Sequence, residues 1–203
     1  MSEIRPIETE YDGRLFRSRL EARWAVFFRE ASIRYLYEHE GYVLPDGTRY
    51  LPDFYLPDIG LFVEIKPLNP TPHEKHKLSE LIKSTGARGT FLGSIPEPFS
   101  AEWPEIENYT PAIYEMYEGA LITDWPYYFC ECATCSAIGY EFDGRSDRLP
   151  CKESYDRDGK GCPRSAHGDK GYNASSRRLV GAYDVARKAR FEFGGQNAAI
   201  KGG

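Results

Sequence analysis

Long apolar runs are absent from this 203-residue chain, and none approaches the roughly 18 residues that a membrane-spanning helix requires. Residues 1–12 are polar and acidic and do not contain the apolar core of a secretory signal peptide. Cysteine is missing outside residues 130–162. We therefore expect a soluble protein of the cytoplasm, without a membrane partner.

Basic residues are missing from the middle of the chain. Residues 94–141 contain nine Asp or Glu and no Lys or Arg, whereas residues 142–203 contain thirteen Lys or Arg and eight Asp or Glu. The net charge of −5 therefore hides a basic C-terminal part. A basic tail after an acidic middle predicts a polyanion-binding surface confined to one part of the molecule.

The composition and the length bound the architecture. A hydrophobic fraction of 41% is ordinary for a globular protein and excludes wholesale disorder. The length suits one domain of about 150 residues with a small appendage. We divide the chain into a first domain, residues 1–126, and a cysteine-rich module with a basic terminal helix, residues 127–203.

Three helices are predicted. Apolar residues recur at steps of three and four through residues 15–31, which gives a helix with one apolar stripe. A second helix has an explicit start, because Thr71 is a good N-cap, Pro72 suits the first helical position and Glu74 completes a capping box. A third, strongly basic helix is expected over residues 176–193.

Strands are predicted in four segments: residues 34–40, 49–56, 61–66 and 90–95. Pro52 restricts the second of them to an edge or a bulge, because proline lacks an amide hydrogen. Residues 96–126 are rich in Pro, Glu and aromatic residues, and we expect irregular packing there. The order of elements predicts an α/β fold with a mostly antiparallel start.

Two of these strands bring together residues that carry chemistry. Alternation in the segment 61–66 places Glu64 and Lys66 on one face, with apolar neighbours on the other. Both side chains are costly at the end of an apolar strand unless they are paired or bind a cation. A hairpin between the second and third strands would bring Asp53 alongside Glu64. A hard divalent cation would relieve the repulsion between the two carboxylates.

This arrangement suits phosphodiester hydrolysis, which needs a positioned water and neutralisation of charge on the phosphoryl oxygens. Mg²⁺ held by Asp53 and Glu64 meets both needs. Lys66 would orient or deprotonate the water, or stabilise the transition state. Glu21, beside the apolar stripe of the first helix, is a fourth candidate that faces the metal or pairs with Arg17 on a solvated helix surface.

The motifs Pro52-Asp53 and Glu64-Ile65-Lys66, preceded by Glu21 on a helix, resemble the PD-(D/E)XK nuclease superfamily over roughly residues 11–95. The likeness is greatest to small phage-encoded members and to transposon endonuclease subunits. It implies a restriction-endonuclease-like mixed sheet flanked by helices. It also implies that Asp53, Glu64 and the main-chain carbonyl of Ile65 bind Mg²⁺ or Mn²⁺, while Lys66 assists the water.

The resemblance implies a DNA endonuclease of a phage or mobile element, acting in the cytoplasm of a bacterial host cell. RNA as the substrate shares the same chemistry, and a homodimer or a larger phage or transposon complex is left open. The alternative is a zinc-ribbon module that binds nucleic acid or protein and whose nuclease-like core is not catalytic. As phosphate contacts we select Arg17, with Arg187 and Arg190 on one face of the terminal helix.

The clustered cysteines predict a structural zinc site in a stretch with few large apolar groups. The pair Cys132-x₂-Cys135 has the spacing of zinc ligands, and the second pair is more loosely spaced. The ligand set is Cys132, Cys135, Cys151 and Cys162. Cys130 in place of Cys132, His167 in place of Cys162, and thiols that bind no metal remain alternatives.

Overall fold

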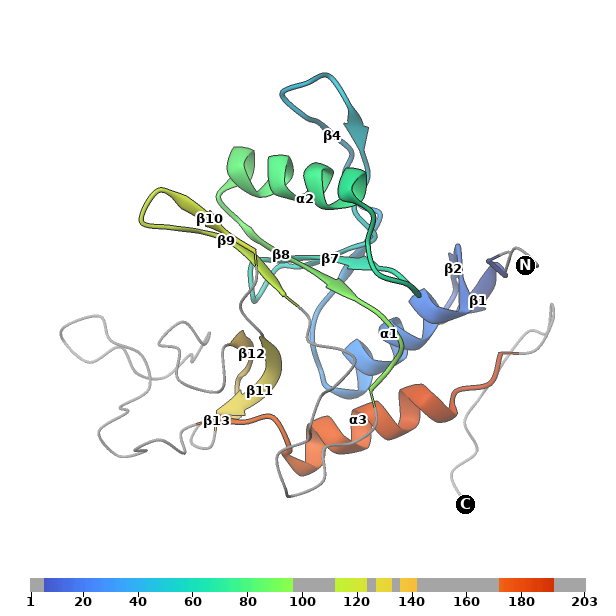
Figure 1. Ribbon diagram of the computed structural model, residues 1–203. Helices are drawn as coiled ribbons and strands as arrows, with labels where there is room; N and C mark the ends of the chain where they lie inside the picture. The colour runs from blue at the N-terminus through green and yellow to red at the C-terminus, as the bar shows by residue number, and fades with distance from the viewer. Residues whose placement is uncertain (1–5, 97–111, 124–126, 133–135, 142–171, 192–203) are drawn as a thin grey trace, which may run out of the picture.

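The computed structural model describes residues 6–96, 112–123, 127–132, 136–141 and 172–191 (Figure 1). These residues form the expected α/β fold, built on a mixed six-stranded sheet with helices on both faces. The strand order is β10-β9-β8-β7-β6-β3. Only β7 and β8 run parallel, and the other neighbours are antiparallel. None of the helices in the described segments is long and apolar enough to span a membrane.

The strands of the central sheet are short. Their bounds are β3 (Leu36–Tyr37), β6 (Phe54–Leu56), β7 (Leu61–Ile65), β8 (Arg88–Leu92), β9 (Ile113–Tyr117) and β10 (Ala120–Ile122). All five residues of β7 are buried, as expected for a strand covered on both faces.

Two layers of helices cover the sheet, with α2 (Pro72–Thr85) on one face and α1 (Arg19–Glu30) and α3 (Arg177–Lys188) on the other (Figure 1). Val63 and Ile65 of β7 pack into the core that contains α1, whereas Phe62 packs under α2. The predicted alternation along this strand is therefore confirmed. Glu64 and Lys66 therefore lie on the face of the sheet that α2 covers.

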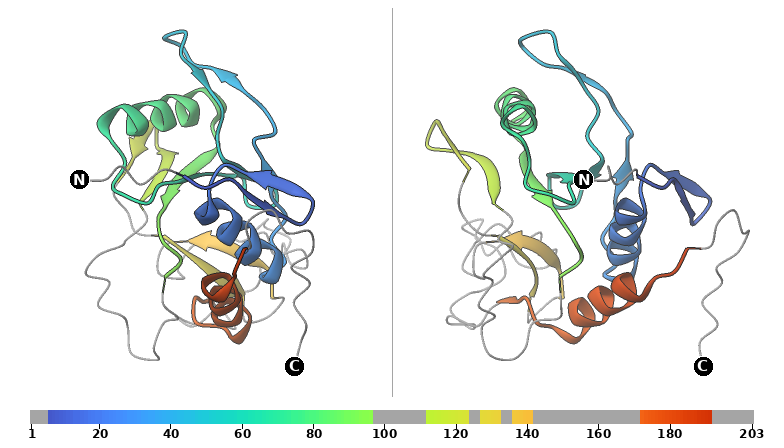
Figure 2. Two further views of the ribbon diagram at one scale, coloured as in Figure 1. Left: turned by 90° about the vertical axis from the view of Figure 1, so that its right-hand side faces the viewer. Right: turned by 45° about the vertical axis from the view of Figure 1, so that its right-hand side comes forward.

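Smaller strand pairs surround this sheet. They are β1 (Thr9–Tyr11) with β2 (Arg14–Phe16), β4 (Tyr42–Val43) with β5 (Arg49–Tyr50), and a three-stranded sheet of β11 (Tyr128–Cys132), β12 (Ile138–Glu141) and β13 (Tyr172–Asn173). Figure 2 shows the β4–β5 hairpin extending beyond α2.

The core on the α1 side is rich in aromatic rings. Phe27 of α1 stacks on Tyr183 of α3 with ring centroids 4.3 Å apart, and Phe129 of β11 packs against the same cluster. The Trp24 indole donates a hydrogen bond to the carbonyl of Gly93, just after β8. Described residues on both sides of position 126 therefore share one core, and the division into two domains stays a prediction.

The helix starts follow side-chain capping. The Thr71 hydroxyl accepts from the Glu74 amide and the Glu74 carboxylate accepts from the Thr71 amide, so the predicted capping box is confirmed. The first helix begins later than the expected residue 15. Ser18 caps it, and the preceding residues form β2. The last helix ends at Lys188, before the expected residue 193.

Two strand predictions were wrong in detail. The expected strand over residues 49–56 is divided into β5 and β6 around Pro52, which cannot donate to a ladder. Irregular packing was expected over residues 96–126, yet residues 113–122 form the β9–β10 hairpin. Its two-residue turn has positive φ at Glu118 and Gly119, the conformation of a tight hairpin turn.

Candidate functional site

The β6–β7 hairpin brings Asp53 and Glu64 together. Phe54 pairs with Val63, so the residues that flank this pair face each other across the hairpin. The Asp53 amide donates to Glu64 Oε1 at 3.4 Å, and the Ile65 amide donates to Asp53 Oδ2 at 2.8 Å. Only 8% of Asp53 and 4% of Glu64 is exposed. The structure therefore holds two carboxylates side by side in a nearly dry position.

Burial and charge make this pair unfavourable without a cation. Burial raises the pKa of Asp53, the negative charges of Glu64 and Glu21 add to the effect, and the pKa is about 7 as a result. The Ile65 amide and the charge of Lys66 act in the opposite direction but do not cancel it. A bound cation would therefore neutralise negative charge that the surrounding residues leave uncompensated.

Lys66 follows β7 and supplies one positive charge to the pair. Its ammonium lies 3.3 Å from Glu64 Oε2 and 3.1 Å from Glu74 Oε1. Burial lowers the pKa of Lys66, but the charge of Glu64 and the hydrogen bond to Glu74 outweigh that effect, so the pKa is raised. The lysine therefore keeps its proton at neutral pH. Its side chain is 26% exposed and so remains reachable from solvent.

Glu74 joins the start of α2 to this site. One of its oxygens accepts from the amide and the hydroxyl of Thr71, each at 2.8 Å, and the other faces Lys66. Partial burial raises the pKa of Glu74, but the hydrogen bonds from Thr71 and Lys66 prevail and lower it to about 2. The sequence identified Glu74 only as a capping residue, because its contact with Lys66 joins a helix start to a strand end.

Glu21 lies near the carboxylate pair and is held by hydrogen bonds. Its carboxylate accepts from the Tyr37 hydroxyl at 2.6 Å, from the Ser18 hydroxyl at 2.7 Å and from the Arg17 amide at 3.2 Å. Only 7% of Glu21 is exposed, so the alternative of a solvated helix carboxylate is wrong. Burial and the bond to Glu21 raise the pKa of Tyr37 to about 12.

Arg17 lies over the open side of the site. Its guanidinium is 3.7 Å from Asp53 Oδ1 and also contacts the Glu38 carboxylate. The Arg17 side chain is 56% exposed, so the same group reaches both the carboxylates and the solvent. Of the three arginines selected from the sequence, this one lies beside Asp53.

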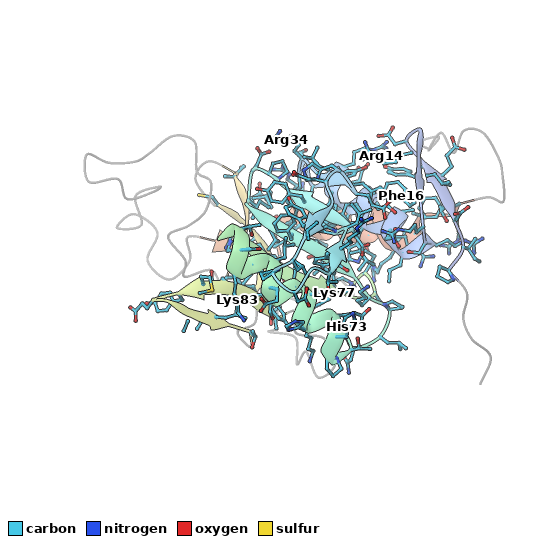
Figure 3. The ribbon with its side chains drawn as sticks, turned by 90° about the horizontal axis from the view of Figure 1, so that it is seen from above. Arg14, Phe16, Arg34, His73, Lys77 and Lys83 are labelled. Atoms are coloured by element: carbon cyan, nitrogen blue, oxygen red, sulfur yellow. The ribbon has the colours of Figure 1, made fainter. Side chains whose placement is uncertain are left out.

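Tyr50 is a further member that the sequence did not single out. It is 6% exposed. Burial, together with the charge of Glu64 and a hydrogen bond to it, raises the pKa of the Tyr50 hydroxyl, which stays protonated. The Lys77 ammonium of α2 lies 5.0 Å from the centroid of its ring. Tyr50 therefore fixes the Glu64 carboxylate from the β5 side. Figure 3 labels Lys77, with His73 and Lys83, on α2.

The donor set fits a hard divalent cation. Within the described residues no three His, Cys, Asp or Glu side chains are grouped so as to hold a metal ion. Asp53 and Glu64 nevertheless provide paired carboxylate oxygens next to the main chain of Ile65, and oxygen is the donor that Mg²⁺ prefers. The residues themselves suggested the two acidic side chains, and the resemblance to the nuclease superfamily implied the main-chain carbonyl.

The other two selected arginines do not share a helix face. Arg187 is in the last turn of α3 and contacts Asp184, whereas Arg190 lies past the helix end, is exposed and donates to the Lys188 carbonyl at 3.1 Å. The expectation of a common face was wrong because α3 ends at Lys188. At the other end of α3, the Arg178 guanidinium donates to the Ala31 carbonyl at the end of α1. The last turn of α3 therefore lies toward the start of α1.

The predicted zinc ligands are described in part. Cys130 and Cys132 are two positions apart on β11, and both are buried. Cys135, Cys151, Cys162 and His167 lie outside the described residues. The zinc site therefore stays a prediction.

No protein-family model matches this chain, and no curated protein is similar enough to be counted as a relative.

Proposed function

We propose that the chain is a metal-dependent nuclease whose centre is the Asp53–Glu64 pair with Lys66. The observation that supports this most is the buried pair of carboxylates, which lie beside a lysine at the open end of a hairpin. Neither a folding role nor a simple ion pair explains two such groups, since burying like charges costs free energy. A site that recruits a divalent cation does explain them.

Asp53, Glu64 and the Ile65 carbonyl are the groups that would hold Mg²⁺ or Mn²⁺. The ion, when bound, neutralises charge on a phosphoryl group and makes a bound water more acidic. The chain prepares the site before binding: the Ile65 amide fixes one Asp53 oxygen, and Tyr50 with Lys66 fixes Glu64. Little rearrangement is then needed when the cation binds.

Lys66 acts as a charged donor in this proposal. In the site without a bound cation, burial is outweighed by Glu64 and Glu74, which raise the pKa of Lys66 and favour the ammonium form. The ammonium would orient the attacking water and stabilise negative charge on the phosphoryl oxygens. Glu74 positions Lys66 for this, because its second oxygen is anchored in the capping box of α2.

The substrate in this proposal is a nucleic-acid strand, and DNA cut internally is the form that the motif resemblance favours. Arg17 would contact a phosphate next to the cleaved one, since its guanidinium faces both solvent and Asp53. Arg190, past the end of α3, would add a more distant backbone contact. An origin in a phage or mobile element rests on the resemblance to the PD-(D/E)XK superfamily.

The test is a cleavage assay on supercoiled, linear and single-stranded DNA and on RNA. We expect cleavage with Mg²⁺ or Mn²⁺, none in EDTA, and binding with little hydrolysis in Ca²⁺, whose coordination is looser. Lys66→Ala should lower the rate by orders of magnitude. Lys83→Ala is the matched control, because Lys83 is an exposed lysine of α2 paired with Glu80. Binding without cleavage under every condition would favour the non-catalytic binding module.

A further inference from the structure

A hollow of about 500 Å³ lies beside the end of α1 and is rich in arginine. Its lining comes from β2, from the end of α1 and from the segment that leads into β3: Asp12, Arg14, Arg29, Ser32, Ile33, Arg34 and Tyr35. Figure 3 shows Arg14 and Arg34 along the edge of the molecule opposite to His73 and Lys83 of α2. Three guanidinium groups from three segments therefore converge on one concave surface.

The three arginines differ in how far they are neutralised. Arg29 lies 3.6 Å from Asp12 and 3.5 Å from Glu30, and its guanidinium packs over the Tyr11 ring at 5.1 Å. Arg34 donates two hydrogen bonds to Asp58, from Nη2 to Oδ1 at 2.8 Å and from Nε to Oδ2 at 3.4 Å, and both side chains are more than half exposed.

Arg14 is exposed and has no ion pair with any residue that the structure describes. The hollow therefore has two arginines held by carboxylates, Arg29 and Arg34, and one, Arg14, without an ion pair among the described residues.

The hollow lies at the end of α1 that is away from Glu21, and the segment leading into β3 connects it to Tyr37 beside Glu21. Tyr35 and Tyr37 both pack on Phe54, with ring centroids 5.6 Å and 5.1 Å from it, so they project to the same side. Tyr37 reaches Glu21, whereas Tyr35 lines the hollow. Glu21 lies near the start of α1 and Arg29 eight residues later, about 12 Å along a helix that rises about 1.5 Å per residue.

We propose that this hollow is a subsite for a backbone phosphate of the bound nucleic acid, separate from the phosphate that is cleaved. Arg14 binds the phosphate, because a planar guanidinium donates two parallel hydrogen bonds to its oxygens, and Arg34 joins it by exchanging its exposed pair with Asp58 for the phosphate. Arg29, held by Asp12 and by the Tyr11 ring, supplies a fixed positive charge behind it. The inference rests on the proposed nuclease function and adds to it a second phosphate contact.

The experiment measures binding of duplex oligonucleotides in Ca²⁺, in a Lys66→Ala background that does not turn over. Arg14→Gln with Arg34→Gln should weaken binding by about fivefold to tenfold and lower the log–log salt slope by up to about 0.9 for each lost contact. Arg49→Gln, an exposed arginine of β5 outside the hollow, is the control and should bind like the parent. Thermal melts of all variants check the fold.

A neutral methylphosphonate placed at single positions then locates the contact. In the parent, one or two adjacent positions should weaken binding, and in the Arg14→Gln/Arg34→Gln variant the same positions should have no further effect. Equal losses at every position would mean that the arginines supply only general charge, which overturns the subsite. So would unchanged affinity in the double variant.

The outcomes separate the two proposals. If the wild-type chain cleaves DNA but the double variant binds like the parent, the subsite is wrong and the nuclease function stands. If the chain neither binds nor cleaves nucleic acid, the proposed function fails and the subsite fails with it.

Discussion

Replacing Asp53 by Asn tests whether the carboxylate pair is electrostatically strained without a cation. Asn has nearly the same shape and keeps an oxygen that accepts from the Ile65 amide, but it cannot ionise. Burial, with the charge of Glu64, raises the pKa of Asp53 from 3.8 to about 7 in the folded chain. The folded state therefore binds this proton more tightly than the unfolded state does.

The sign of the pH effect follows from linkage. Between pH 4 and 7 the unfolded chain loses the Asp53 proton while the folded chain keeps it, so rising pH lowers the free energy of unfolding. A shift of about three pKa units corresponds to about 4 kcal/mol, fully developed above pH 7. Glu74, with a pKa lowered to about 2, contributes in the opposite sense, but its contribution is complete by about pH 5.

The assay is urea unfolding of wild type and Asp53→Asn in EDTA, from pH 4 to pH 8. We expect similar stability near pH 4 and a variant that is more stable by up to about 4 kcal/mol at pH 8. Adding Mn²⁺ at pH 8 should stabilise the wild type and leave the variant nearly unchanged, because the ion binds only the folded, paired site. A stability difference that does not change with pH would refute the reasoning.

Three further predictions concern the core, the cysteines and the basic tail. Phe27→Ala should lower the free energy of unfolding by about 3 to 5 kcal/mol, because its buried ring stacks on Tyr183; a loss below about 1 kcal/mol in urea melts would contradict the packing described. Metal analysis of chain purified without chelator should find about one zinc per molecule, and an unchanged melt after zinc removal would argue against a structural site. Arg190→Ala should lower the salt slope of duplex binding by about 0.9, whereas Arg187→Ala should change it less, since Asp184 already neutralises Arg187; equal slopes in both variants and wild type would exclude the contact.

The parts of the fold that the sequence predicted are those controlled by local pattern. The Thr71–Glu74 capping box and the alternation along β7 each depend on residues a few positions apart, and both are confirmed. The juxtaposition of Asp53 and Glu64 needed only a short hairpin, whose register the apolar residues of β6 and β7 set.

Some parts of the fold were missed because they depend on contacts between distant segments. Others were missed because the composition of the segment does not indicate strands. The Glu74–Lys66 contact joins a helix start to a strand end, and no periodicity within either element predicts it. The β9–β10 hairpin follows a stretch rich in Pro and Glu, which hid a Glu118-Gly119 turn that is typical of hairpins.

Arg190 was wrongly predicted to lie on the last helix, because basic residues continue past the end of that helix. Lys188 is the final helical residue, and Arg190 then bonds to the exposed carbonyls there. Helix ends are set by capping and by packing on other elements, and charge patterns do not report either.

The most direct test of the account is plasmid nicking by wild type, Glu64→Gln and Glu80→Gln, each with Mg²⁺ and with EDTA. Glu80 is a matched control because it is a glutamate of α2 that pairs only locally with Lys83 in the described structure. We expect wild type and Glu80→Gln to nick supercoiled DNA at similar rates with Mg²⁺ and not at all with EDTA, while Glu64→Gln is slower by orders of magnitude. Nicking by Glu64→Gln at the wild-type rate, or nicking that persists in EDTA, would contradict the assignment of the Asp53–Glu64 pair as a metal-dependent catalytic centre.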